Sequence, residues 1–239
     1  MLITAKKLRP SKVRNAVRRR WFEYRVPHTP MRQMPGVIEL GSSYGGWLIP
    51  DGQVGPDWVC YCVGAGGDVS FDLDLIDRYE ATVRAIDPVS DYIDAAIVQA
   101  GDEPRFSAYR AAIATSDGPI RLQVTHDADS LSVSPAGLYE SHTFIDAPGR
   151  TLPSLMAELG DERIDLLKLD VEGGEYELLA TLDLRALGVK IFATQLHHTG
   201  TVGDARALIA RLRDDGYEPV ACRSAVKLTF ADRDIIQAR

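Results

Sequence analysis

Short apolar runs alternate with amphipathic segments from residue 58 onward. The runs predict buried strands at residues 58–67, 81–88, 106–114, 163–170 and 189–198. The segments between them carry apolar residues at helical spacing and predict helices at residues 70–79, 90–100, 175–182 and 204–216. Strands that alternate with helices indicate βαβ units, and hence an α/β fold with a mostly parallel sheet covered on both faces.

Other segments depart from this alternation. Adjacent strand patterns at residues 217–223 and 226–232 predict one antiparallel element at the end of the sheet. Residues 37–50 predict a small hairpin ahead of the sheet, and residues 119–125 a hairpin partner for the third strand. Residues 126–150 are rich in Ser, Asp, His, Pro and Gly without a clear period, which predicts a long functional or mobile loop.

A basic segment precedes the hairpin. Val13, Val17, Trp21 and Tyr24 fall at helical spacing and predict an amphipathic helix over residues 11–24. Residues 1–32 hold ten basic residues and one acid, a net charge of +9 that leaves −16 for the remainder of a chain of formal charge −7. The helix either packs its stripe on the domain or contacts an anionic membrane or acidic lipid-linked substrate.

The bulk composition bounds the class of protein. The 239 residues are 45% hydrophobic and 26% charged, which suits one large domain, residues 37–239, with an N-terminal extension, residues 1–36. Three cysteines argue against a disulfide scaffold and fit a reducing compartment, and Cys60 and Cys62 are expected as buried thiols. No apolar run approaches the roughly 20 residues of a transmembrane helix, and none follows the basic N-terminus as a secretory signal does. A cytoplasmic location is therefore expected.

A glycine-rich turn follows the first core strand. Gly64, Gly66 and Gly67 lie where ligands bind in open α/β sheets, whereas Val69 occupies the third glycine position of the dinucleotide fingerprint. Asp87 ends the second strand, 23 residues after Gly64, where a carboxylate can accept both ribose hydroxyls or simply begin an Asp-Pro turn. A nucleoside ligand without a pyrophosphate, such as S-adenosylmethionine, needs no third glycine.

Several motifs together resemble the FkbM-type methyltransferases. They are YCVGAGGDVSFDLDLIDRY, AIDP, LLKLDVEGGEYELL, YGGW at 44–47 and QLHH at 195–198. The resemblance spans roughly residues 37–230, and the block K-x-D-x-E-G-x-E at 168–175 is its most specific part. It implies a Rossmann-like class I fold of seven strands with the last antiparallel, S-adenosylmethionine as cofactor, and methylation of hydroxyls on sugars, lipids or polyketides. Members often carry Glu-x-His where this chain has Gln195-Leu196-His197.

The catalytic residues predicted are His197, Asp170, Glu172 and Lys168. Methyl transfer to oxygen needs in-line positioning and benefits from a base near the hydroxyl, for which His197 is the first candidate. Asp170 ends its strand at the expected substrate position, and Lys168 shares its sheet face and can pair with it. Glu172 and Glu175 stand at the mouth of the next helix, where an anion is stabilised whatever its role.

The binding residues predicted fall into two groups. Those for the cofactor are Gly64, Ala65, Gly66, Gly67, Asp68, Asp87, Ala114, Thr115 and Ser116. Those for the substrate are His198, His142 and Ser132. No metal is predicted, although Asp170, Glu172 and a histidine would be acceptable ligands for a divalent ion.

The leading hypothesis is an S-adenosylmethionine-dependent O-methyltransferase that acts on a small-molecule, sugar or glycolipid acceptor. A nicotinamide-dependent Rossmann oxidoreductase is one alternative. A non-catalytic methyltransferase-like module at a membrane surface is the other. The acidic balance of the chain predicts no nucleic-acid partner. Residues 11–24 leave a peripheral contact at the inner membrane face as an open expectation.

Overall fold

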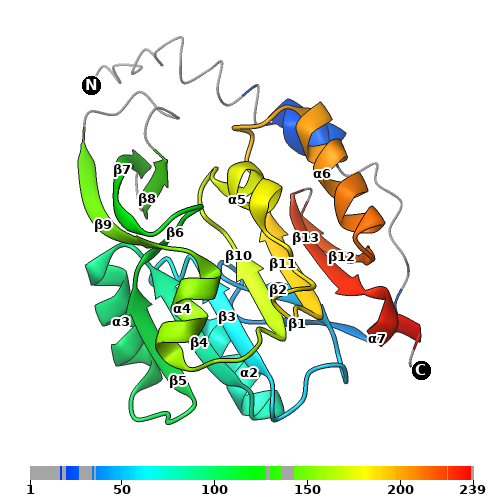
Figure 1. Cartoon of the computed structure of the whole chain (residues 1–239), viewed down its shortest axis with the longest axis horizontal. Coiled ribbons are helices and arrows are strands. Elements are labelled where there is room, and N and C mark those ends of the chain that lie inside the picture. The colour runs from blue at the N-terminus through cyan, green and yellow to red at the C-terminus, as the bar shows by residue number, and fades with distance from the viewer. Residues whose placement is uncertain are drawn as a thin grey trace, which may run out of the picture.

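The computed structural model describes residues 17, 20–26, 34, 36–127, 130–135, 143–224 and 226–237. A seven-stranded sheet forms the centre, with helices on both of its faces (Figure 1). In spatial order its strands are β12 (Tyr217–Ser224), β13 (Lys227–Asp232), β11 (Ile191–Gln195), β10 (Leu166–Leu169), β3 (Val59–Val63), β4 (Thr82–Asp87) and β5 (Phe106–Arg110).

The pairing of these strands confirms the predicted fold class. From β11 to β5 all neighbours are parallel, whereas β13 is antiparallel to both β11 and β12. The last strand is thus the antiparallel one, as the Rossmann-like class I methyltransferase fold requires. The chain order reverses between β3 and β10, which places a topological switch point at the carboxyl ends of these two strands.

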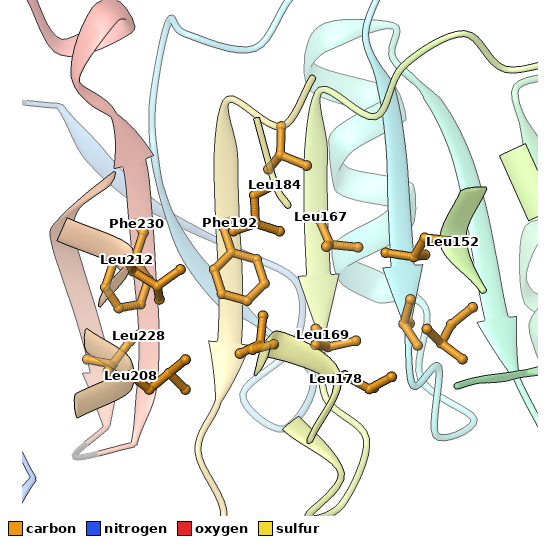
Figure 2. Close-up of a cluster of buried hydrophobic side chains, with 14 of the residues drawn as sticks. Leu152, Leu167, Leu169, Leu178, Leu184, Phe192, Leu208, Leu212, Leu228 and Phe230 are labelled. Carbon is orange, nitrogen blue, oxygen red and sulfur yellow. The ribbon is translucent and has the colours of Figure 1, made fainter. Parts of the chain in front are cut away.

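Helices cover the two faces of the sheet. The described helices that cover the faces are α2 (Ser70–Tyr79), α3 (Ser90–Ala100), α4 (Leu152–Leu159), α5 (Glu175–Thr181) and α6 (Val202–Asp214), and α7 (Arg233–Gln237) follows β13. Alternate strand residues face opposite sides, so Leu167 and Leu169 pack with α4, α5 and α6, and Leu166 packs with α2. Figure 2 shows the first of these cores, in which Phe192 and Phe230 stack with their ring centroids 6.1 Å apart.

A second sheet of four strands lies beside the first. Its strands are β6 (Ala112–Ile113), β7 (Gly118–Asp127), β8 (Ser130–Pro135) and β9 (Phe144–Arg150), in the order β6-β9-β7-β8. The prediction of a long loop over residues 126–150 is therefore wrong. The serines of SLSVS concealed a period-two pattern, since Leu131 and Val133 alternate with them.

Two further elements also differ from the prediction. The third strand was expected to run to residue 114, but β5 ends at Arg110 and the chain changes sheet to pair β6 with β9. Helix α4 was not predicted, although Thr151 caps it by accepting a hydrogen bond from the Ser154 amide and Gly160 ends it in the left-handed region. The hairpin of β1 (Val37–Leu40) and β2 (Trp47–Pro50) is confirmed.

Residues 20–25 are helical and lie beside α6 (Figure 1). Phe22 and Val26 are buried in the main core, whereas Val17, Trp21 and Tyr24 are 63%, 53% and 70% exposed. The interpretation that the predicted stripe packs on the domain is wrong, because other residues supply the packing face. Val13 lies outside the described residues. None of the helices in the described ranges is long and apolar enough to cross a bilayer.

We expect Asp165→Ala to destabilise the fold strongly. The carboxylate is fully buried and accepts hydrogen bonds from the Val59 amide, Arg163 and Lys190 at 2.8–3.0 Å. Its removal leaves these donors unpaired and should lower the free energy of unfolding by about 3–5 kcal/mol. Urea denaturation followed by circular dichroism measures the loss. The exposed Asp57→Ala is the control, and equal losses in the two variants would contradict the expectation.

Candidate active site

A cleft of about 380 Å³ opens at the carboxyl ends of β3, β4 and β10. It lies at the switch point of the sheet and is large enough for a small-molecule ligand. The glycine turn after β3 and the neighbouring segment after β10 both line it. Ile120 and Leu122 of the second sheet add an apolar wall, and Tyr44 from the β1–β2 turn closes one side. Residues far apart in the sequence thus converge on one space.

Two glycines of the turn are required for different reasons. A Cβ atom on Gly64 would lie 1.9 Å from the carbonyl oxygen of Asp170, so only glycine lets this turn approach the end of β10. The buried Lys168 donates a hydrogen bond to the Gly64 carbonyl and thereby holds the turn. A Cβ atom on Gly66 would meet no atom within 4 Å, because that position borders the open cleft. The first glycine serves packing, and the second leaves room for a ligand.

Asp87 combines the two roles that its sequence position left open. One carboxylate oxygen accepts a hydrogen bond from the Val89 amide at 2.9 Å, as in an Asx turn. The other accepts from the Gly66 amide at 3.1 Å, and the side chain lines the cleft. Burial raises the pKa of Asp87, while these amides and Lys168 oppose the rise. A carboxylate has about four acceptor positions, so further hydroxyl donors can be accommodated.

Asp68 joins the turn to the hairpin. Its carboxylate accepts hydrogen bonds from the Ser42 hydroxyl at 2.6 Å and from the Ser70 amide at 3.0 Å. Partial burial acts to raise the pKa of Asp68, but these hydrogen bonds outweigh it and keep the pKa below the ordinary value. The side chain therefore presents a fixed negative charge to the cleft.

The predicted residues divide by whether they line the cleft. Those that do are Gly64, Ala65, Gly66, Asp68, Asp87, Ala114, Thr115, Lys168, Asp170 and Glu172. Those that are described but do not are Gly67, Ser116, His197 and His198. His142 and the side chain of Ser132 lie outside the described residues. The structure thus brings together most of the predicted cofactor residues and three of the four predicted catalytic ones.

His197 stands behind the carboxylates of the cleft. Its Nδ1 donates to Oε1 of Glu175 at 2.8 Å, while its Nε2 lies 3.4 Å from Oε2 of Glu172 and 3.9 Å from Oδ1 of Asp170. The Gln195 amide lies 3.1 Å from the same Nε2. The residue that departs from the family pattern thus contacts the histidine directly.

Glu175 was expected to serve the start of its helix, and the structure adds a second role. The side chain is fully buried, and its Oε1 accepts from the amides of Val171 at 3.1 Å and Gly173 at 3.2 Å as well as from His197. These three hydrogen bonds fix the imidazole ring relative to the loop after β10. Sequence spacing could not reveal the contact, because it joins α5 to the segment after β11.

The charges of this cluster depend on one another. Burial alone would lower the pKa of His197, but Glu175, Glu172 and Asp170 raise it well above the ordinary value of 6.5. The histidine is therefore an imidazolium at neutral pH. Burial raises the pKa of Asp170, against the opposing effect of His197 and Lys168. Oδ1 of Asp170 is buried and makes no hydrogen bond among the described residues, and the raised pKa gives the carboxylate more than ordinary base strength.

The same cluster can be considered as a metal site. Asp170, Glu175 and His197 offer ligand atoms that all lie within 4.8 Å of one another. This set differs from the one considered from sequence, in which Glu172 took the place of Glu175. Within this set, Nδ1 of His197 is hydrogen-bonded to Glu175.

Several cleft residues were missed by sequence reasoning. Among them are Asp72, Tyr92, Lys227 and, apart from its place in the YGGW motif, Tyr44. Asp72 is fully buried, which raises its pKa to about 7, and Lys168 opposes the rise. Lys227 lies 4.8 Å from the Trp47 ring and joins the last strand to the hairpin. Tyr44 and Asp72 lie within quoted motifs, whereas Tyr92 and Lys227 reach the cleft through tertiary packing.

We expect the stability contributed by His197 to decrease as the pH rises. A pKa raised in the folded state means that folding favours the protonated form, so the contribution is complete below about pH 6.5 and is lost as the pH rises through the folded pKa. Urea denaturation of the wild type and His197→Asn from pH 6 to 10 measures it. The two should converge at high pH, with His198→Asn as the control, and a constant difference would contradict the assignment.

Residues 63–219 match the family model described as "Methyltransferase FkbM domain". The match covers more than half of the chain. The protein belongs to the FkbM methyltransferase family. The predicted resemblance is thereby confirmed, and the matched segment of this FkbM methyltransferase includes the glycine turn, Asp87, Asp170 and His197.

The individual proteins that resemble this FkbM methyltransferase match only part of the chain or share little sequence identity with it. An 88-residue stretch is 41% identical to the AMB antimetabolite synthetase AmbE of Pseudomonas aeruginosa, over 35% of this chain and only 4% of that protein. Among solved structures, the Methanococcus jannaschii fibrillarin pre-rRNA processing protein aligns at a TM-score of 0.45 and 12% identity, over 75% of this chain and 68% of that one. A fibrillarin/Nop5p complex gives 0.42 and 11%, over 74% and 73%.

Proposed function

We propose that this FkbM methyltransferase transfers a methyl group from S-adenosylmethionine to a hydroxyl of a sugar, glycolipid or polyketide-type acceptor. One observation carries the proposal. The glycine turn, Asp87 and Asp170 line a single cleft at the switch point, where Gly64 contacts the backbone of Asp170. A nucleoside-binding wall and a basic group are thus close enough to serve one reaction.

The residues of the cleft fit the cofactor. The open space at Gly66 would let the ligand approach the protein backbone, and Asp87 would accept hydrogen bonds from the ribose hydroxyls. The fixed charge of Asp68 suits the amino group of the methionyl part. Ala114 and Thr115 would cover the adenine. When bound, S-adenosylmethionine supplies a methyl group on a cationic sulfonium, and a lining rich in carboxylates favours that cation.

Asp170 is the proposed base. Transfer of a methyl group to a hydroxyl releases one proton, and the carboxylate of Asp170, a residue of the cleft lining, would accept it. Burial raises the pKa of this carboxylate, the positive charge of His197 opposes the rise, and Glu175 holds the imidazole in place. The sequence predicted His197 itself as the base, but its raised pKa and its position behind the lining favour a positioning role. Lys168 holds the glycine turn.

Polar side chains at the mouth of the cleft favour a neutral acceptor that carries several hydroxyl groups. Glu172, Gln195 and Tyr44 offer a carboxylate, an amide and a hydroxyl there. Such groups pair with sugar hydroxyls through hydrogen bonds. The lining carboxylates outnumber Lys168 and Lys227, which disfavours phosphorylated or carboxylated acceptors.

Calorimetry with S-adenosylhomocysteine tests the proposal. We expect binding by the wild type and about 10–100-fold weaker binding by Asp87→Asn, because a charged acceptor to the ribose is lost. Asp91→Asn, an exposed carboxylate on α3, is the control. Heat with NADH but none with S-adenosylhomocysteine would refute the proposal in favour of an oxidoreductase. Turnover that depends on added metal and is lost with a chelator would refute the metal-free role of His197.

A further inference from the structure

The helix at residues 20–25 has two apolar faces, of which only one is buried. Phe22 and Val26 anchor it in the main core. Val17, Trp21 and Tyr24 lie on the outside and are more than half exposed. The anchor fixes the helix to the domain, so the exposed aromatic residues are presented on a firm support. These three exposed residues, together with Arg20 and Arg25, form the aromatic–basic face.

Positive charge surrounds these aromatic side chains. Arg20 and Arg25 are exposed, and the Arg25 guanidinium lies 5.6 Å from the centre of the Trp21 ring. Arg206 of α6 is also exposed and donates to the Arg25 carbonyl at 3.4 Å. The first 32 residues carry a net charge of +9, against −16 for the remainder. Positive charge is therefore concentrated in the N-terminal part of the sequence of an acidic protein.

The helix lies on the same edge of the sheet as the cleft. It packs beside α6 (Figure 1), whose residue Arg206 is near the start of that helix. Helix α6 follows the carboxyl end of β11, where His197 joins the carboxylates of Asp170 and Glu172. A flat partner on the aromatic–basic face would therefore lie near the edge at which the cleft opens.

We propose that the aromatic–basic face docks on an anionic lipid bilayer. Trp and Tyr side chains favour the boundary between headgroups and acyl chains, where their rings are buried and their polar atoms stay hydrated. Arginine pairs with lipid phosphates, and an interfacial helix with this combination of residues binds parallel to the surface. A bilayer touches only this face, whereas a polyanion that wraps the molecule would meet its acidic body. The inference does not depend on the proposed function.

Vesicle binding by the full chain tests this surface. Trp47 and Trp58 are buried, so a change in tryptophan emission on binding reports Trp21. With vesicles of phosphatidylcholine and phosphatidylserine we expect co-sedimentation and a blue shift, both decreased by high salt. With phosphatidylcholine alone we expect at least about tenfold weaker binding, since the arginines lose their partners.

Paired variants distinguish binding through this face from nonspecific adsorption to vesicles. Trp21→Ser with Tyr24→Ser should decrease anionic-vesicle binding about tenfold or more. Ile97→Ser with Val98→Ser changes an exposed apolar pair on α3 and should leave binding unchanged. Circular dichroism checks that both fold. No vesicle binding, equal binding to neutral vesicles, or an unaffected Trp21/Tyr24 variant would overturn the proposal, as would tighter binding to an oligonucleotide at the same salt.

Discussion

Asp170→Asn is expected to lower kcat by about 10²–10⁴-fold while S-adenosylhomocysteine still binds. The amide keeps the shape of the carboxylate but cannot accept the hydroxyl proton. Gly66 and Asp87 belong to other segments of the lining and are unchanged, so the residues proposed to hold the cofactor stay intact. Steady-state kinetics with an accepted polyol measures the loss in kcat, and calorimetry measures the binding.

Two further variants make the test of Asp170 specific. Glu158→Gln changes an exposed carboxylate on α4 and should leave kcat unchanged. Glu172→Gln should lower kcat less than Asp170→Asn, because Glu172 lies at the mouth and is more exposed. A larger loss for Glu172→Gln than for Asp170→Asn would transfer the role of base to Glu172.

Gly66→Ala is expected to weaken S-adenosylhomocysteine binding about 10–100-fold, because the added methyl group projects into the cofactor side of the cleft. Gly101 gives a matched control. It has the same φ of +58° and the same open surroundings, but it ends α3 away from the cleft. Gly101→Ala therefore places a side chain at the same positive φ without the obstruction. Equal binding losses in the two variants would contradict the assignment of Gly66.

Gly64→Ala should behave differently from both. Its Cβ atom would overlap the Asp170 carbonyl, and its φ of +82° adds strain. We expect this variant to lose stability or fail to fold, as shown by thermal denaturation, whereas Gly66→Ala folds. A stable Gly64→Ala protein that binds the cofactor normally would show that the turn after β3 can move away from β10.

The composition of each segment was enough to predict most of the main sheet. Strands β3, β4 and β10 are buried on both faces, so they read as continuous apolar runs. Such a run can be recognised in the sequence without knowledge of the neighbouring strands. Much of the second sheet escaped prediction because its strands are partly polar and some pair with distant segments, as where the chain leaves β5 and β6 pairs with β9. Pairing between segments that are distant in the sequence does not change the period of apolar residues within either segment, so that period cannot predict the pairing.

The sequence by itself determined that a glycine turn, Asp87 and the Asp170 block meet at the carboxyl ends of parallel strands. Strand direction forces these ends to one edge of the sheet. Only the tertiary structure decided that His197 stands behind Asp170 rather than in the cleft, that Glu175 holds it, and which face of the first helix is exposed. These outcomes depend on side-chain contacts between separate elements. Such contacts are set by packing in three dimensions and not by spacing along the chain.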